Sequence, residues 1–180
     1  YQKLRDAERT DCLRLCSSGK IRQTDTKEKG GLDMYTVSFF GHRFLDRFSP
    51  IEEKLVPYLR RWLEKEEYTE FLVGRDGDFD QLVTSALLRT RRGKGNRNNR
   101  LIWVMPYPKA EYLQNPEDFE CYYDEIEICA ASEKAYPKAA IGVRNRAMVD
   151  RSDCCVFYVE HPTGGAWQTL RYAEKQGKTV

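Results

Sequence analysis

Short apolar segments rich in β-branched and aromatic residues alternate along this chain with longer segments of helical hydrophobic period. The predicted strands cover residues 34–40, 69–73, 101–105 and 154–159, with a weaker one at 125–129. The predicted helices cover residues 51–65, 79–91, 139–149 and 167–176, with a short irregular helix at 110–121. Alternating strands and helices joined by short turns are typical of an α/β fold around a mostly parallel sheet.

The polar residues 1–33 are expected to be an N-terminal appendage, and residues 34–180 a single domain. Within the appendage we expect a short helix at 6–16 and a linker at 24–31. The chain of 180 residues is long enough for a full core. Its end, Lys178-Thr179-Val180, resembles the start of a strand, so we expect the domain to be truncated there.

The charge and cysteine content narrow the class of protein. The 30 basic and 28 acidic residues leave a formal net charge of +2, so no overall field attracts nucleic acid or a membrane. No apolar run approaches the roughly 20 residues of a membrane span. Cys154 and Cys155 lie in a predicted strand, while Cys12 and Cys16 lack the further ligands of a tetrahedral metal site. We expect a cytoplasmic protein with reduced cysteines and neither metal nor cofactor.

Three polar or glycine-rich turns follow predicted strands and therefore share one edge of the sheet. They are Gly41-His42-Arg43, residues 74–80 and residues 162–165. Ligands of parallel α/β sheets gather at this carboxyl edge. The basic loop 89–100 follows a helix instead, so it is placed at the opposite edge. We expect it to be a solvated surface loop, with nucleic-acid contact as the alternative.

The Gly164-Gly165 turn lies between a predicted strand and a predicted helix. Backbone N–H groups at a helix start can face an anion, so we expect a phosphate there. Arg43 can form paired hydrogen bonds to phosphate. Arg144, one helix earlier, is expected to supply a second such contact, with an ordinary surface arginine as the alternative. Asp80 fits either a helix cap or a partner for ribose hydroxyls.

Eleven residues make up the predicted ligand-binding site, and its catalytic residues, if any, are unknown. They are Gly41, His42, Arg43, Gly74, Gly77, Asp80, Arg144, Asn145, Thr163, Gly164 and Gly165.

Four pieces in this order resemble the SLOG superfamily, which includes the LOG phosphoribohydrolases and the DNA-processing DprA/Smf proteins. The pieces are residues 40–43, residues 71–80, residues 144–153, and Gly164-Gly165-Ala166 with residues 172–178. The likeness is greatest to the YpsA-like branch. It implies a Rossmann-like three-layer fold with a mostly parallel sheet, which binds nucleotides or nucleotide-derived ligands at these loops.

The resemblance to LOG enzymes implies that Arg144 and the Gly164-Gly165 turn contact the ligand of a nucleoside monophosphate hydrolase. LOG enzymes also carry a catalytic glutamate in the helix after the glycine turn, where this chain has residues 169–172, Thr-Leu-Arg-Tyr. The nearest acid, Glu174, lies further along. Because an oxocarbenium-like transition state needs a nearby carboxylate, this departure favours binding over hydrolysis.

We therefore predict a domain that binds or senses a nucleotide or a nucleotide-derived phosphorylated molecule. One alternative is a LOG-like nucleoside monophosphate N-glycosidase that uses Asp76, Asp78, Asp80 or Glu160 in place of the missing glutamate. The other is a DprA-like DNA-associated protein that uses the basic loop 89–100. We predict against nucleic acid and membrane as partners and leave a homo-oligomer open.

Overall fold

The computed structural model describes residues 22–23, 34–65, 68–92 and 98–180. Its centre is a six-stranded sheet in the order β1-β5-β4-β3-β2-β6, and all neighbouring strands are parallel. The strands are β1 (Arg22–Gln23), β2 (Met34–Gly41), β3 (Tyr68–Val73), β4 (Asn99–Met105), β5 (Glu125–Ile128) and β6 (Cys154–Tyr158). The predicted Rossmann-like three-layer fold with a mostly parallel sheet is confirmed.

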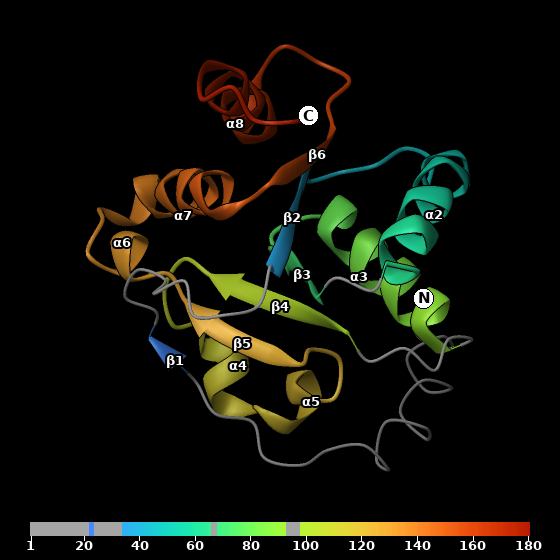
Figure 1. The fold of residues 1–180 in the computed structure, drawn as a ribbon. Helices are drawn as coiled ribbons and strands as arrows, with labels where there is room; N and C mark the ends of the chain where they lie inside the picture. Colours follow the sequence, from blue (N-terminus) through green and yellow to red (C-terminus); the bar gives the residue numbers. More distant parts are fainter. Residues whose placement is uncertain (1–21, 24–33, 66–67, 93–97) are drawn as a thin grey trace.

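Helices cover both faces of the sheet (Figure 1). The helices are α2 (Ser49–Leu63), α3 (Asp78–Arg92), α4 (Ala110–Gln114), α5 (Glu117–Glu120), α6 (Ala130–Glu133), α7 (Pro137–Arg151) and α8 (Gly164–Lys175). The apolar faces of α2 and α3 bury one side of the sheet in the larger core, together with side chains of α4 and α5. A smaller core, which includes Met148, Val149 and Ala173, joins the other side to α7 and α8.

The path of the chain creates a crevice in the sheet. The chain adds β3, β4 and β5 on one side of β2 and then returns to place β6 on the other side. Gly41 at the end of β2 pairs in register with Tyr158 at the end of β6. Connections from these two strands diverge at their carboxyl ends, which is where ligands bind in open α/β sheets.

Several boundaries differ from the predicted ones. The irregular helix predicted at 110–121 is two short helices, because Pro116 disfavours helical backbone at Asn115. Helix α7 begins at Pro137, since proline suits a first helical turn, and the loop predicted before it contains α6. Helix α3 continues to Arg92 and β4 begins at Asn99, which shortens the basic loop; its residues 93–97 lie outside the described ones.

Part of the predicted appendage joins the sheet, because Arg22–Gln23 pairs in parallel with β5. The helix predicted at 6–16, the linker at 24–31, and Cys12 and Cys16 lie outside the described residues. The domain boundary at residue 33 therefore stays a prediction. Across the described part of the chain, no helix is long and apolar enough to cross a membrane.

Candidate functional site

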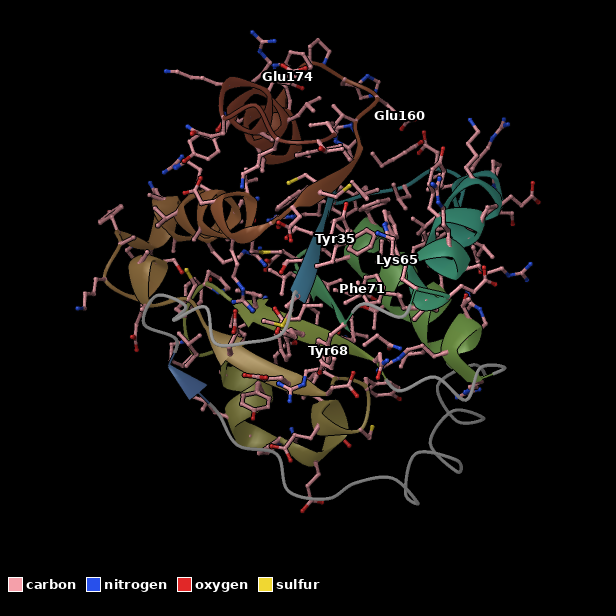
Figure 2. The ribbon with its side chains drawn as sticks, viewed as in Figure 1. Tyr35, Lys65, Tyr68, Phe71, Glu160 and Glu174 are labelled. Carbon is pink, nitrogen blue, oxygen red and sulfur yellow. The ribbon has the colours of Figure 1, made fainter. Side chains whose placement is uncertain are left out.

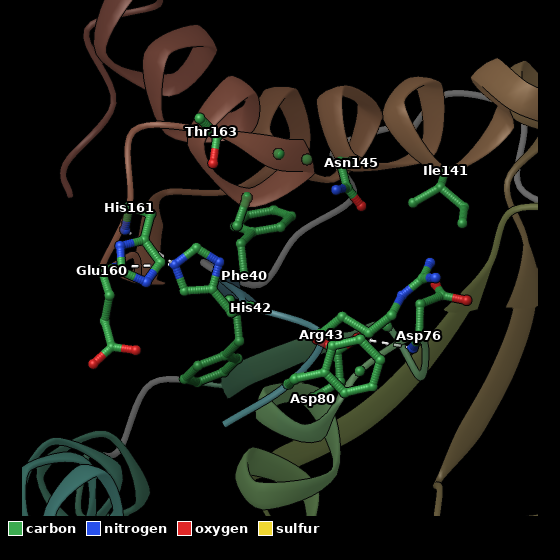
Figure 3. Close-up of a pocket in the computed structure, with 18 of the residues that line it drawn as sticks. Phe40, His42, Arg43, Asp76, Asp80, Ile141, Asn145, Glu160, His161 and Thr163 are labelled. Atoms are coloured by element: carbon green, nitrogen blue, oxygen red, sulfur yellow. Dashed lines mark hydrogen bonds between the residues drawn. The ribbon is translucent and has the colours of Figure 1, made fainter. Parts of the chain in front are cut away.

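A cavity of about 450 Å³ lies at the carboxyl ends of β2 and β6. All eleven predicted site residues line it (Figure 3). The structure therefore brings together turns that are far apart in the sequence, while ligand contact by these residues stays a prediction. Phe44, Asp76, Ile141 and His161 also line the cavity and were absent from the predicted site.

Two of the predicted glycines are required by packing of the protein itself. A Cβ atom on Gly41 would lie 2.3 Å from the ring of Phe79. A Cβ atom on Gly77 would lie 2.6 Å from Cα of Arg43. These glycines allow the turn after β2 to pack closely on the start of α3, which shapes one wall of the cavity.

Arg144 forms part of the cavity wall, and its guanidinium is already bonded. Its side chain is 3% exposed, with Nη1 donating to the Val104 carbonyl at 2.9 Å and Nη2 donating to Asp76 Oδ2 at 2.6 Å. Gly74 makes room for it, since a Cβ there would lie 2.6 Å from Nη1. Arg144 is thus not an ordinary surface arginine. Contact with a phosphate would use whichever donors these bonds leave free.

Asp76 also accepts a bond from Lys109 Nζ at 2.6 Å. Burial alone would raise the pKa of Asp76, but Arg144 and Lys109 outweigh burial and lower it. Lys109 was missed from the sequence, although it follows the carboxyl end of β4 as the recognised turns follow their strands. Arg144 and Lys109 therefore neutralise the negative charge of the Asp76 carboxylate beside the cavity.

Asp80 lies deeper, and burial raises its pKa to about 6 even though Arg144 nearby lowers it. Its Oδ2 accepts the backbone N–H of Asp76 at 3.0 Å, just before α3 begins. This bond fixes the turn that leads into α3, and the capping role of Asp80 stays a prediction. Bonding to ribose hydroxyls stays a prediction.

The two helices that begin at the cavity differ at their first turns. Helix α3 begins with two acidic residues, and Asp78 Oδ2 accepts the N–H of Leu45 at 3.1 Å. Helix α8 has no acidic residue in its first turn, and Thr163 before it makes no side-chain cap. Gly164 has φ +83°, which favours glycine, and a Cβ on Gly165 would have no neighbour within 4 Å. An anion is therefore favoured at α8 rather than at α3.

The loop before α8 is tied to the turn after β2. His42 Nε2 accepts the backbone N–H of Glu160 at 2.8 Å and that of His161 at 3.4 Å. The two histidine rings lie side by side with centroids 5.8 Å apart (Figure 3). His42, which follows the neighbouring strand β2, thus positions the loop that leads to the Gly164-Gly165 turn.

Asn145 connects α7 to the first turn of α8. Its side-chain amide donates to Thr169 Oγ1 at 3.2 Å, and that hydroxyl donates to the Gly165 carbonyl at 2.8 Å. Thr169 lies in the segment where the resemblance to LOG enzymes would place a glutamate. The buried threonine therefore supports the glycine turn here.

The remaining carboxylates take different places. Glu160 lines the cavity and accepts a hydrogen bond from Tyr158, which raises the pKa of Tyr158 to about 12. Glu174 forms an ion pair with Arg171 at 2.7 Å on the exposed side of α8 (Figure 2). Of the four acids considered for hydrolysis, Asp76, Asp80 and Glu160 line the cavity. Asp78 instead bonds the neighbouring turn.

Comparison with known proteins finds the fold but no sequence family. No family model and no curated protein matches the chain. DprA from Streptococcus pneumoniae superposes with a TM-score of 0.56 and 16% identity, over 81% of this chain and 48% of that one. DprA from Helicobacter pylori superposes with a TM-score of 0.52 and 18% identity, over 80% of this chain and 62% of that one. The chain thus spans about half to three fifths of these proteins.

The shared fold agrees with the resemblance to the SLOG superfamily, in which the DprA proteins are grouped, while the YpsA-like branch stays a prediction. The H. pylori protein binds single-stranded DNA. Our prediction against nucleic acid as a partner is therefore wrong. It relied on net charge, which measures the field of the whole chain and says nothing about a local site.

Proposed function

We propose that this chain binds single-stranded DNA and holds one nucleotide unit in the cavity, with its phosphate against the amino end of α8. The observation that carries the proposal is the first turn of α8, which opens into the cavity without an acidic side chain or a side-chain cap. The open space at Gly165 lets a phosphate approach the backbone N–H groups.

Arg43 supplies a cation on the other side of the cavity. Its side chain is exposed and has no ion-pair partner among the described residues. A guanidinium can bind two phosphate oxygens at once. The fold likeness to a DprA protein that binds single-stranded DNA supports a polymer rather than a small molecule as the source of the phosphate.

The cavity also contains Asp46, Asp80 and Glu160, so the site is not strongly basic. We therefore expect contact with only one or two phosphates. For single strands this corresponds to a slope of roughly −0.7 to −1.4 in a plot of log affinity against log salt concentration. Fluorescence anisotropy of a labelled twelve-residue oligothymidylate over a salt series measures this slope. Affinity that is independent of salt would contradict phosphate binding.

A free nucleotide is the second candidate, because about 450 Å³ is within the range of small-molecule sites. Competition by thymidine monophosphate separates the two ligands. The DNA proposal predicts that the monophosphate displaces the oligonucleotide only at concentrations at least about tenfold above those of unlabelled oligonucleotide, counted per nucleotide. Equal potency would favour the free nucleotide, and chromatography of the same mixture for released base tests hydrolysis.

A further inference from the structure

We propose that Phe44, Tyr107 and Tyr136 form a base-stacking track for single-stranded DNA along the carboxyl edge of the sheet. This inference rests on the proposed function and extends it from one nucleotide in the cavity to several nucleotides beside it. Phe44, Tyr107 and Tyr136 are 80%, 39% and 72% exposed. Single exposed apolar residues are ordinary. Three exposed aromatic residues at the same edge of the sheet indicate a binding surface.

The topology places all three at the same edge. Phe44 follows β2 and lines the cavity, and Tyr107 follows β4. Tyr136 precedes α7, which returns from the carboxyl edge toward β6. The Ser132 hydroxyl of α6 donates to the Pro106 carbonyl at 2.7 Å, so the segment before Tyr136 packs beside the turn that carries Tyr107.

The backbone on both sides of Phe44 is anchored. The Arg43 carbonyl accepts the N–H of Asp78 at 2.8 Å, and the N–H of Leu45 donates to the Asp78 carboxylate at 3.1 Å. The Leu45 side chain is buried in the larger core. Phe44 is therefore presented to solvent at the cavity by a fixed turn, which lowers the entropic cost of stacking a base on it.

Basic side chains accompany two of the aromatic residues. The groupings are Arg43 with Phe44, and Lys134 and Lys138 with Tyr136, whereas Lys109 near Tyr107 is already paired with Asp76. Lys134 and Lys138 are exposed, on either side of Tyr136. Aromatic platforms next to cations that follow the backbone are how proteins bind single strands without reading their sequence.

The spacing of the strands sets the length of the track. From β2 to β5 there are three strand spacings, or about 14 Å. We expect a single nucleotide in the cavity to reach Phe44, which lines it, but not Tyr136, which does not. The track therefore predicts that Tyr136 contributes only to the binding of longer oligonucleotides.

The test measures anisotropy for the parent chain and for Phe44→Ala, Phe44→Trp and Tyr136→Ala. Tyr58→Ala is the matched control, because Tyr58 is 60% exposed but lies within α2. The probes are twelve-residue and two-residue oligothymidylates and a twelve-residue strand whose sugars lack bases. Melting curves without DNA check that each variant is folded.

We expect Phe44→Ala to weaken binding of both base-carrying probes about 5- to 100-fold, and Phe44→Trp to restore it. Tyr136→Ala should weaken binding of the twelve-residue oligothymidylate only. Tyr58→Ala should weaken binding of neither oligothymidylate. The base-free strand should bind the parent and all variants with the same affinity. Equal losses on the base-free strand, or no losses in variants of a chain that binds DNA, would overturn the track alone. A parent chain that binds no probe would overturn the proposed function as well.

Discussion

Asp76 and Asp80 lie four residues apart where α3 begins, yet their pKa values shift in opposite directions. Asp76 is paired with Arg144 and Lys109, and these cations lower its pKa despite burial. Burial is the largest influence on Asp80 and raises its pKa to about 6. A carboxyl group in the wall of a phosphate site is least repulsive when it can take up a proton near neutral pH.

The raised pKa of Asp80 makes a prediction about stability. Because the folded chain holds this proton more tightly than the unfolded chain, Asp80 contributes stability below about pH 4 that is lost as the pH rises through 6. An asparagine at this position does not ionise, so the Asp80→Asn variant does not lose stability in this pH range for this reason. We expect the free energy of unfolding of the variant, relative to the parent, to be about 1–2 kcal/mol higher at pH 7.5 than at pH 4.5.

Urea unfolding at the two pH values measures this difference. The contributions of the other titrating groups to stability are the same in parent and variant, so they cancel in the comparison. Asn can still accept the N–H of Asp76 through its amide oxygen. An identical pH dependence in both proteins would show that Asp80 titrates in the folded chain as it does in the unfolded chain.

The roles of the residues at the cavity could be predicted only in part from the sequence. Position after a strand was enough to find Arg43 and the Gly164-Gly165 turn at the cavity. The burial of Arg144 was not, because it depends on Asp76 and the Val104 carbonyl, which are distant in sequence. The apolar residues of α7 are not gathered on one face, so their spacing gives no signal that one of its arginines faces inward.

At the scale of elements, the start of α8 is held by the turn after β2. His42 accepts the N–H groups of Glu160 and His161, so it limits how far the loop after β6 can move. We predict that His42→Ala increases backbone amide hydrogen exchange in residues 159–165. We also predict that it weakens oligonucleotide binding, because the anion site would be less well positioned.

His42→Gln is the matched variant, since its amide oxygen can replace the acceptor nitrogen of the imidazole. We expect it to keep most of the protection, and helix α2 to exchange alike in all three proteins. Each lost bond contributes about 1 kcal/mol or less at this exposed position. If His42→Gln exchanged as fast as His42→Ala, the acceptor role of the imidazole would be wrong.

The elements themselves were largely predictable, since α2, α3 and α8 carry the hydrophobic period of a helix and β2 to β6 are short apolar segments of strand-forming residues. The failures have local causes. Pro116 splits one predicted helix, and Pro137 starts another earlier than its apolar residues do. The two-residue β1 could not be found, because it is too short for any alternation and is defined only by pairing with β5.

At the scale of the whole molecule, the strand order creates the site. Placing β6 beside β2 after the chain has reached β5 leaves a crevice between two diverging connections, and the predicted residues meet there. The alternation of elements predicted a parallel sheet but not this order, which arises from non-local pairing. The net charge of +2 likewise gave no indication of a local phosphate-binding site, because basic and acidic residues elsewhere in the chain cancel in the sum.

The central claim is that a DNA phosphate lies against the first turn of α8, and one substitution tests it most directly. Gly165→Val fills the open space at that turn, where a Cβ would have no neighbour within 4 Å. Gly142→Val makes the same change in α7, where a Cβ would have only an ordinary contact with Arg146 at 3.9 Å. The measurement is the affinity of both variants for the twelve-residue oligothymidylate, with melting curves as the check on folding. We predict at least about a tenfold loss for Gly165→Val and little change for Gly142→Val. Parental affinity in a folded Gly165→Val variant would contradict the account.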